Sequence, residues 1–201
     1  MSYDLTIITP TYFRPKALRR ALISTIDTNL FVERLVIATT NDLQVSEVVQ
    51  EFECRLLRVP DKMDSGASPR NLGIAEALGK YVCFLDDDNE YVKGGPETLF
   101  GAASGFDVGI CQVKSGKRLM PRTGSRVIRE KYVDTACVCA RTELARRVQW
   151  VNGIELPNHD FHWITALLAL DPTPTVNFVD SVICNISVIM HGMTAEEFAK
   201  K

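Results

Sequence analysis

The stretch that decides the fold is Tyr81-Val82-Cys83-Phe84-Leu85-Asp86-Asp87-Asp88, where an uncharged run leads directly into three aspartates. A short run of this kind predicts a strand that is buried on both faces, as in a mostly parallel sheet. Three adjacent carboxylates at its end repel one another and lose hydration, and a cation relieves both costs. Mg²⁺ and Mn²⁺ prefer such oxygen ligands, commonly together with phosphate oxygens. The alternative interpretation is a solvated acidic turn.

The chain before this stretch alternates between strand and helix patterns. Apolar runs predict strands at 5–9, 35–38 and 56–59, and the apolar spacing predicts helices from residue 15 and over 43–52. A third helix is expected to have Ser68 as its N-cap, Pro69 at its first position and Gly79 at its end. Repeats of strand, helix and strand predict an open α/β sheet that binds its ligands at the carboxyl ends of the strands.

The second half of the chain is less regular. We expect strands at 107–113 and 135–140, one or two strands within 176–189, and helices at 143–148 and 158–170. Segment 114–129 is polar, basic and interrupted by glycines, which predicts a mobile loop. This loop is either a solvated basic surface or a lid that closes over a diphosphate.

The composition excludes several classes of protein. The 201 residues favour one domain, and 46% hydrophobic with 24% charged residues excludes disorder, collagen and coiled coil. A net charge of −2 argues against a nucleic-acid partner, and the absence of a run of about 18 apolar residues argues against a transmembrane segment. The six cysteines form no Cys-x-x-Cys pair, and we see no signal peptide. We therefore expect reduced thiols and a cytoplasmic location.

Two further segments reach the same edge of the predicted sheet. Arg70 and Asn71 open the third helix, where an arginine opposes the helix dipole unless it faces an anion or the acidic cluster. The segment Thr9-Pro10-Thr11-Tyr12-Phe13-Arg14 follows the first strand. It offers backbone groups and a tyrosine ring to a base, and Arg14 to a phosphate. The structural alternatives are a solvated arginine, a capping asparagine and an ordinary loop.

Taken together, three segments resemble family 2 glycosyltransferases of the GT-A fold. They are Leu5–Tyr12, Ala67–Ala75 and Gly79–Asp88. Each segment alone is a weak indication of the family, but the three in this order and spacing are a specific one. The resemblance covers roughly residues 4–95. It implies a single GT-A domain, with residues 1–95 as the nucleotide-sugar half and 96–201 as the acceptor half. Such a short chain is also compatible with one domain of a longer protein.

The resemblance also implies an activity. That activity is inverting transfer of a hexosyl or deoxyhexosyl group from a nucleotide-diphosphate sugar, with a UDP-sugar favoured, to a hydroxyl of a glycan or glycoconjugate. It implies Mn²⁺ or Mg²⁺ as cofactor. By the same resemblance Thr9, Pro10, Thr11 and Tyr12 line the nucleoside pocket, and Arg14 lies near the diphosphate. Asp42 is the available base contact. Arg70, Asn71, Asp86 and Asp87 approach the nucleotide, and Asp86 and Asp88 form the Asp-x-Asp motif with Asp88 on the metal.

The catalytic base and the third metal ligand fall in the second half. In this resemblance Asp160 takes the position of the general base, with Glu155 in reserve, and His191 is a candidate metal ligand or a structural histidine. A zinc site made from His159, Asp160 and His162 is an alternative.

Two other functions stay open. One is a non-catalytic sugar-nucleotide-binding domain. The other is a metal-dependent phosphotransferase, which is disfavoured because Glu90 stands where its motif has Thr or Val. The sequence specifies neither the sugar, the acceptor nor the oligomeric state.

Overall fold

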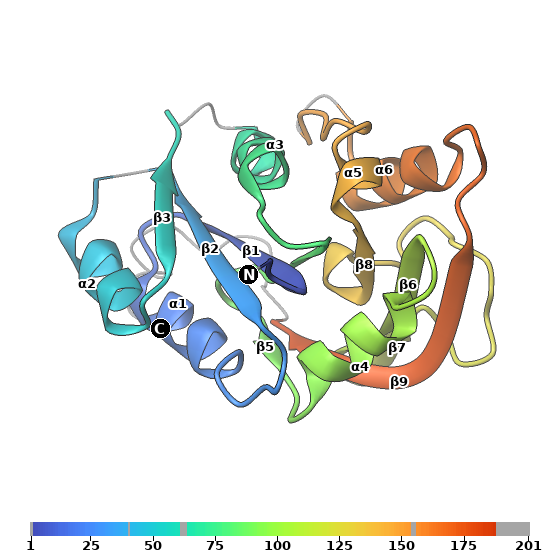
Figure 1. Ribbon diagram of the computed structural model, residues 1–201, viewed down its shortest axis with the longest axis horizontal. Helices are drawn as coiled ribbons and strands as arrows, with labels where there is room; N and C mark the ends of the chain where they lie inside the picture. Colours follow the sequence, from blue (N-terminus) through green and yellow to red (C-terminus); the bar gives the residue numbers. More distant parts are fainter. Residues whose placement is uncertain (1, 40, 61–63, 154–155, 188–201) are drawn as a thin grey trace.

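The structure is a computed structural model that describes residues 2–39, 41–60, 64–153 and 156–187. Within these residues nine strands form one sheet, in the order β3-β2-β1-β4-β8-β6-β9-β5 with β7 paired to β6. Helices lie on both sides of the sheet (Figure 1). The glycine, proline and apolar patterns of the sequence account for most of these elements.

The first half of the chain builds the parallel part of the sheet. β1 pairs with β2 and β4, and β2 pairs with β3, all in parallel. Every residue of β1 and of β4 is buried, as expected for strands covered on both faces. The bounds are Leu5–Thr11 for β1, Val32–Ala38 for β2, Arg55–Arg58 for β3 and Tyr81–Phe84 for β4.

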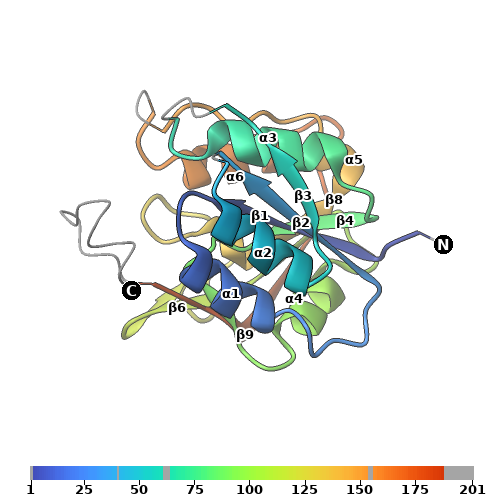
Figure 2. The ribbon, with the colours of Figure 1, turned by 90° about the vertical axis from the view of Figure 1, so that its left-hand side faces the viewer.

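Three helices cover this parallel part. α1 (Pro15–Ile23) and α2 (Leu43–Glu51) pack on one face, where Leu18 and Val48 share an apolar cluster with Val36. α3 (Ala67–Glu76) crosses the other face (Figures 1 and 2). Gly73 allows this close approach, because a Cβ there would lie 2.5 Å from Cγ2 of Ile8.

The predicted start and end of the third helix are wrong. Ser68 is not the N-cap, because α3 begins at Ala67 after Gly66, whose φ of +82° suits glycine. Asp64 takes over the capping, since its Oδ2 accepts the Ser68 backbone N–H at 2.9 Å. The helix ends at Glu76, before Gly79.

The second half adds antiparallel pairs to the sheet. β8 pairs antiparallel with β4 and with β6, and β9 pairs parallel with β6 through an irregular register near Gln112. β9 curves around this half (Figure 1). The bounds are Val108–Ser115 for β6, Arg118–Met120 for β7, Val138–Arg141 for β8 and Val176–Ile186 for β9.

Several elements here differ from the sequence prediction. The expected strand 135–140 begins as a 3-10 turn, η1 (Thr135–Cys137), because the Asp134 side chain accepts the Ala136 N–H and tightens the chain. The expected loop 114–129 contains β7. β5 (Glu90–Tyr91) and α4 (Gly95–Ala103) were not predicted, and α5 (Thr142–Ala145) and α6 (His159–Leu168) are shorter than expected.

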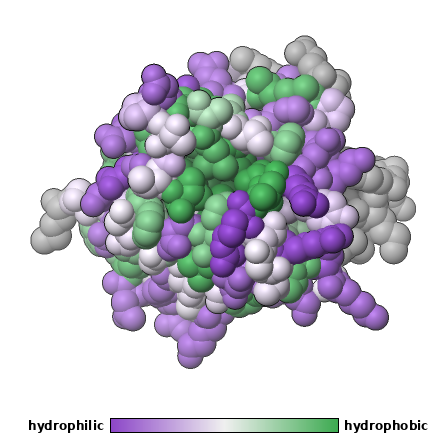
Figure 3. Space-filling view, turned by 90° about the vertical axis from the view of Figure 1, so that its right-hand side faces the viewer, coloured by the Kyte–Doolittle hydropathy of each residue, from purple (hydrophilic) through white to green (hydrophobic). Residues whose placement is uncertain are grey.

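All six cysteines are free thiols, as predicted. No helix among the described residues is long and apolar enough to cross a membrane. On the side where β9 lies in Figure 1, the surface has an apolar area bordered by hydrophilic residues (Figure 3).

Candidate functional site

A cavity of about 700 Å³ opens at the carboxyl ends of the parallel strands. This is the edge at which an open α/β sheet is expected to bind its ligands. Seven of the predicted site residues line it. They are Pro10, Thr11, Tyr12, Arg14, Arg70, Asp86 and Asp160. Thr39, Asp64, Ser65, Gly66, Pro69 and His159 complete the lining.

Arg70 binds the first aspartate of the triplet. Its Nη2 donates to Oδ1 of Asp86 at 2.6 Å, and its Nη1 donates to the carbonyls of Ser65 and Gly66. The guanidinium carbon also lies 5.0 Å from the ring centre of Trp150. Burial alone lowers the pKa of Arg70, but the nearby carboxylates outweigh it and the pKa rises. The unfavourable place of an arginine in the first turn of α3 is thus offset by an anion.

Arg14 binds the other two aspartates. Its Nε donates to Oδ2 of Asp87 and its Nη1 to Oδ2 of Asp88, both at 3.0 Å. Thr11 donates to the same Asp87 oxygen at 2.7 Å. Burial raises the pKa of Asp87 to about 7, against the opposing effects of Arg14 and Thr11. These bonds join the end of β1 to the end of β4, so the two loops hold one another in place.

The structure places two predicted nucleotide contacts away from the cavity surface. The Asp87 side chain is fully buried and Thr9 is buried in β1, so neither has surface to offer a ligand. Asp87 instead orients Arg14. Asp88 is also not among the residues that line the cavity, and its carboxylate pairs with Arg14.

Asn71 braces a tryptophan. Its Nδ2 donates to the carbonyl of Trp150 at 3.0 Å, and its Oδ1 accepts the Trp150 N–H at 2.8 Å. The Trp150 ring stacks on Trp163 at 5.1 Å and meets the His159 ring edge-on at 5.6 Å. The amide of Asn71 therefore holds Trp150, whose ring lies against Arg70, and its contact with a nucleotide stays a prediction.

Asp160 lies in the first turn of α6, where the helix dipole favours a negative charge. Its Oδ1 lies 3.4 Å from Nε2 of His159 and accepts no hydrogen bond from the described residues. Burial raises the pKa of Asp160, while Arg70 and His159 lower it. Asp160 lines the cavity, and a carboxylate whose pKa is raised by burial can accept a proton.

Asp134 is the acidic residue that the sequence reasoning missed. It caps η1 through the Ala136 N–H, at 2.9 Å. Burial, followed by the charges of Asp160 and Asp86, raises the pKa of Asp134 to about 8. The folding of η1 against α6 and β4 thus brings a third carboxyl group to Arg70. An aspartate two residues before a backbone N–H is a common local cap, so nothing in the sequence marks this one.

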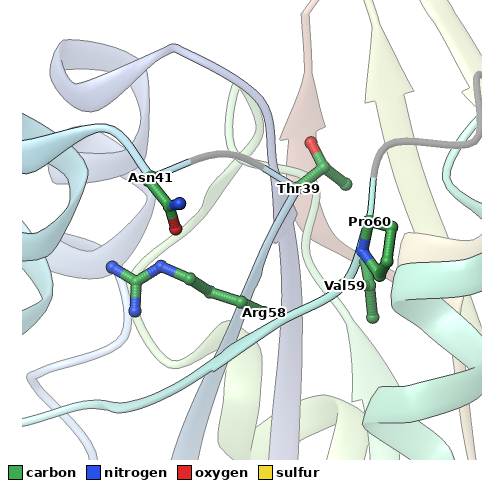
Figure 4. Close-up of a pocket in the computed structure, with 5 residues that line it drawn as sticks. All are labelled: Thr39, Asn41, Arg58, Val59 and Pro60. Atoms are coloured by element: carbon green, nitrogen blue, oxygen red, sulfur yellow. The ribbon is translucent and has the colours of Figure 1, made fainter.

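A second, smaller cavity adjoins the first at Thr39. It has a volume of about 290 Å³, and Asn41 and Arg58 line it beside Pro60 (Figure 4). Asp42, the expected base contact, is not in either lining, because its Oδ1 caps α2 by accepting the Gln44 N–H at 2.8 Å. Sequence reasoning missed Asn41 and Arg58, since Arg58 comes from β3 and only the sheet brings it beside the end of β2.

Some of the oxygen ligands that a divalent metal ion needs are present at the sheet edge. Asp86 is one-third exposed, and only its Oδ1 accepts a hydrogen bond from the described residues, so its other oxygen is available. Asp88 is committed to Arg14. The described ranges contain no group of three or more His, Cys, Asp or Glu side chains that could hold a metal. His191 and Glu155 lie outside the described residues. Asp86 fits a hard cation that takes its remaining ligands from a phosphate.

Comparison with curated proteins gives matches to part of longer chains. An uncharacterized glycosyltransferase of Rickettsia conorii is 33% identical over 92 residues, which cover 44% of this chain and 15% of that protein. A second uncharacterized glycosyltransferase, from Rickettsia felis, matches to the same extent. The chain thus matches only about 15% of the length of these curated relatives.

Solved structures are similar over nearly the whole chain. S. aureus TarS 1–349 matches with a TM-score of 0.75 and 17% identity, over 92% of this chain and 60% of that chain. The same protein in complex with UDP-GlcNAc matches over 98% of this chain and 61% of that chain, with a TM-score of 0.73 and 17% identity. The mannosyltransferase PcManGT from Pyrobaculum calidifontis, in complex with GDP-Man and Mn²⁺, matches with a TM-score of 0.70 and 16% identity, over 96% of this chain and 59% of that chain. These likenesses confirm the predicted GT-A fold.

The sequence also matches a family model. The model described as glycosyl transferase family 2 covers residues 6–152, which run from the second residue of β1 past the end of β8 and include all three aspartates of the triplet.

Proposed function

Because the chain belongs to glycosyl transferase family 2, we propose that it transfers a sugar from a nucleotide-diphosphate donor to a hydroxyl of a glycan or glycoconjugate. The observation that carries the proposal is the convergence of Asp86, Arg70 and Asp160 on one cavity of about 700 Å³. Asp86 would bind the metal ion that accompanies the donor, and the Arg70 guanidinium would bind the diphosphate. Asp160 would act as the base that takes the proton of the acceptor hydroxyl. Residues 1–95 would bind the donor and residues 96–201 the acceptor.

The donor would lie along the loop after β1. Tyr12 is about half exposed in the cavity, so its ring offers a face on which a base or ribose packs. Arg14 would approach the diphosphate. The base would reach the smaller cavity at Thr39, where Asn41 and Arg58 supply hydrogen-bonding groups. A UDP-sugar is favoured, since TarS binds UDP and UDP-GlcNAc.

Asp160 would act as the general base. Its carboxylate accepts the proton of the acceptor hydroxyl while that oxygen forms a bond to the anomeric carbon. The bond from this carbon to the diphosphate oxygen breaks on the opposite side, so the configuration inverts and the nucleoside diphosphate leaves. General base catalysis typically contributes about 10²–10⁴-fold. The raised pKa of Asp160 makes proton acceptance more favourable than for an ordinary aspartate.

Arg70 would stabilise the charge that develops on the leaving diphosphate. It is buried and held by Asp86 and by Trp150, so no reorientation is needed during the reaction. Mn²⁺ or Mg²⁺, held by Asp86 and, after rearrangement of Arg14, by Asp88, would supply Lewis-acid neutralisation of the same charge. We also propose a reducing compartment such as the cytoplasm, which the six free thiols support.

Calorimetric titration with UDP and GDP, with and without MnCl₂, tests the donor assignment. We expect UDP to bind more tightly than GDP, and more tightly with Mn²⁺ than without. Asp86→Asn should weaken Mn²⁺-dependent binding at least tenfold, whereas the exposed control Asp27→Asn should leave it unchanged. If the wild-type protein binds neither nucleotide under any condition, the proposed function is wrong.

A further inference from the structure

Positive charge is concentrated in one segment of an otherwise acidic chain. Residues 114–131 contain seven lysines and arginines and one acidic residue, Glu130, whereas the whole chain has a net charge of −2. The remaining residues therefore carry a net charge of −8. The seven cations are Lys114, Lys117, Arg118, Arg122, Arg126, Arg129 and Lys131.

The basic segment 114–131 is attached to the sheet by backbone pairing and by side-chain contacts. Its first residues form a hairpin in which β7 pairs antiparallel with β6, and Gly116 turns the chain with a φ of +57°. Its middle is fastened to β9, because Asp180 accepts the Gly124 N–H at 3.2 Å and binds Arg126 at the same distance. The backbone of this segment is therefore held in place at the hairpin and at Gly124.

Two arginines of the segment share one aromatic ring. The guanidinium carbons of Arg118 and Arg122 lie 4.2 and 4.6 Å from the ring centre of Tyr132. Arg122 donates to the Tyr132 hydroxyl at 3.1 Å, and Arg118 donates to the carbonyl of Lys131. Together with Thr123 they line a cavity of about 520 Å³, which we name the arginine cleft.

The arginine cleft is lined by two positive charges, and none of its described lining residues is acidic. Among the described residues no carboxylate forms an ion pair with Arg118 or Arg122. Each guanidinium has five N–H donors in a planar fork, and these contacts use one of them in each side chain. Two like charges held on one ring repel each other, and an anion in the cleft relieves that repulsion. Forked donors of this kind suit phosphate or carboxylate.

The arginine cleft is connected to the residues around Asp160. Glu130 accepts a hydrogen bond from Nδ2 of Asn158 at 2.7 Å, and Asn158 is the N-cap of α6. Tyr132 is two residues from Asp134, so their Cα atoms are at most about 7 Å apart. None of the described residues that line the donor cavity comes from 114–131. The cleft thus belongs to a segment that contacts the N-terminus of α6, the helix that carries the proposed base, and it lies outside the proposed donor site.

From this arrangement we propose that the arginine cleft binds an anionic group of the acceptor, and that the acceptor is a glycan bearing phosphate or carboxylate groups. The inference rests on the proposed function. Contacts to a remote acceptor anion would orient the attacking hydroxyl, which is how binding energy away from the reacting atoms contributes to rate. A concave cleft lined by two arginines fits a discrete anion better than the flat surface of a membrane.

Binding of defined probes tests this proposal. The probes are three oligosaccharides of equal length: a phosphodiester-linked one, a hexuronate one and a neutral glucan. We expect the wild-type protein to bind one or both of the charged oligosaccharides, and to bind them more weakly at about 200 mM salt than at about 50 mM. We expect its affinity for the neutral oligosaccharide to be at least tenfold lower than its affinity for the charged one. The first two arms distinguish phosphate from carboxylate.

Two variants separate the arginine cleft from general electrostatics. Arg118→Gln/Arg122→Gln should weaken binding of the charged probe at least tenfold, while Arg126→Gln, whose arginine already has Asp180 as partner, should weaken it less than about threefold. Equal binding of charged and neutral probes, no loss in the double variant, or an equal loss in the control would overturn the proposal. So would binding to anionic phospholipid vesicles through the same arginines without binding to either charged oligosaccharide. UDP binding is measured in parallel. If the wild-type protein does not bind UDP, the proposed function is wrong. If the double variant still binds UDP, its loss of oligosaccharide binding is specific to the arginine cleft.

Discussion

The two sets of arginines in this molecule are held in opposite ways. At the edge of the parallel sheet, Arg14 and Arg70 each bind carboxylates of the triplet at 2.6–3.0 Å. In the arginine cleft, Arg118 and Arg122 contact a tyrosine ring, a hydroxyl and a carbonyl. The first set is balanced before any ligand arrives. No carboxylate of the described residues pairs with the second set, so a ligand would supply the counter-charge.

The difference in burial explains this contrast. Arg70 is only 6% exposed, and a buried charge without a partner costs several kcal/mol. Arg118 and Arg122 are exposed, so water solvates each charge and the fold tolerates them without a carboxylate partner. A ligand at the sheet edge therefore meets arginines that already have carboxylate partners, whereas a ligand in the cleft adds the carboxylate or phosphate partner.

The largest effect is expected at the proposed base. Asp160→Asn keeps the size of the side chain but removes its ability to take a proton, so kcat should fall about 10²–10⁴-fold. The dissociation constant of UDP should change less than about twofold. Steady-state kinetics and calorimetric titration measure the two quantities. Loss of UDP binding with the loss of turnover would assign Asp160 to the donor site instead.

The next effect compares the two sets of arginines directly. Arg70→Ala leaves Asp86 without its charged donor and removes packing from Trp150, and should lower the free energy of unfolding by about 2–3 kcal/mol. Arg118→Ala, in the exposed set, should change it by less than about 0.5 kcal/mol. Urea unfolding curves measure both. Similar losses in the two variants would show that the arginine cleft is part of the structural framework.

A smaller effect is expected where glycine makes room for Arg70. Gly66 has a φ of +82°, and a Cβ there would collide with Nη1 of Arg70. Gly66→Ala should therefore cost about 1–2 kcal/mol in unfolding free energy, whereas the same change at Gly101, where a Cβ meets nothing within 4 Å, should be neutral or stabilising because Gly101 lies in α4. Thermal melts of the two variants give the comparison. A neutral Gly66→Ala would mean that Arg70 does not depend on this loop.

The smallest effect on stability is expected at Asp107, which pairs with Arg141 in the second half of the chain. The N–H and hydroxyl of Thr175, and then Arg141, lower the pKa of Asp107. Because its pKa is lower in the folded state, Asp107 stabilises the fold above the unfolded pKa of about 3.9 and loses that contribution as pH falls through the folded value. Asp107→Ala should cost about 1 kcal/mol at pH values near 7, and the difference from wild type should shrink below about pH 4. Unfolding curves along a pH series measure it; a constant difference would exclude the carboxylate charge as its cause.

Local sequence patterns predicted most of the first half. The uncharged run before Asp86, the prolines at Pro15 and Pro69, and the apolar spacing of α1 and α2 indicate their elements because strand burial, proline geometry and helical period are local properties. α4 and η1 were missed. α4 carries small residues without a clear apolar stripe, and η1 depends on a side-chain cap at Asp134 that resembles many others.

The sequence by itself determined the GT-A fold and the residues able to carry charge at the sheet edge, because the motifs that specify them lie within single strand-to-helix junctions. Tertiary structure alone decided how those residues are used. It paired Asp87 with Arg14, gave Asn71 to Trp150, and brought Arg58 and Asn41 together across two strands. It also gathered Asp134, Asp160 and Asp86 around Arg70, residues up to 90 positions apart in the chain. Such pairings depend on strand order and on the crossing of α3 and α6 over the sheet, which no local pattern encodes.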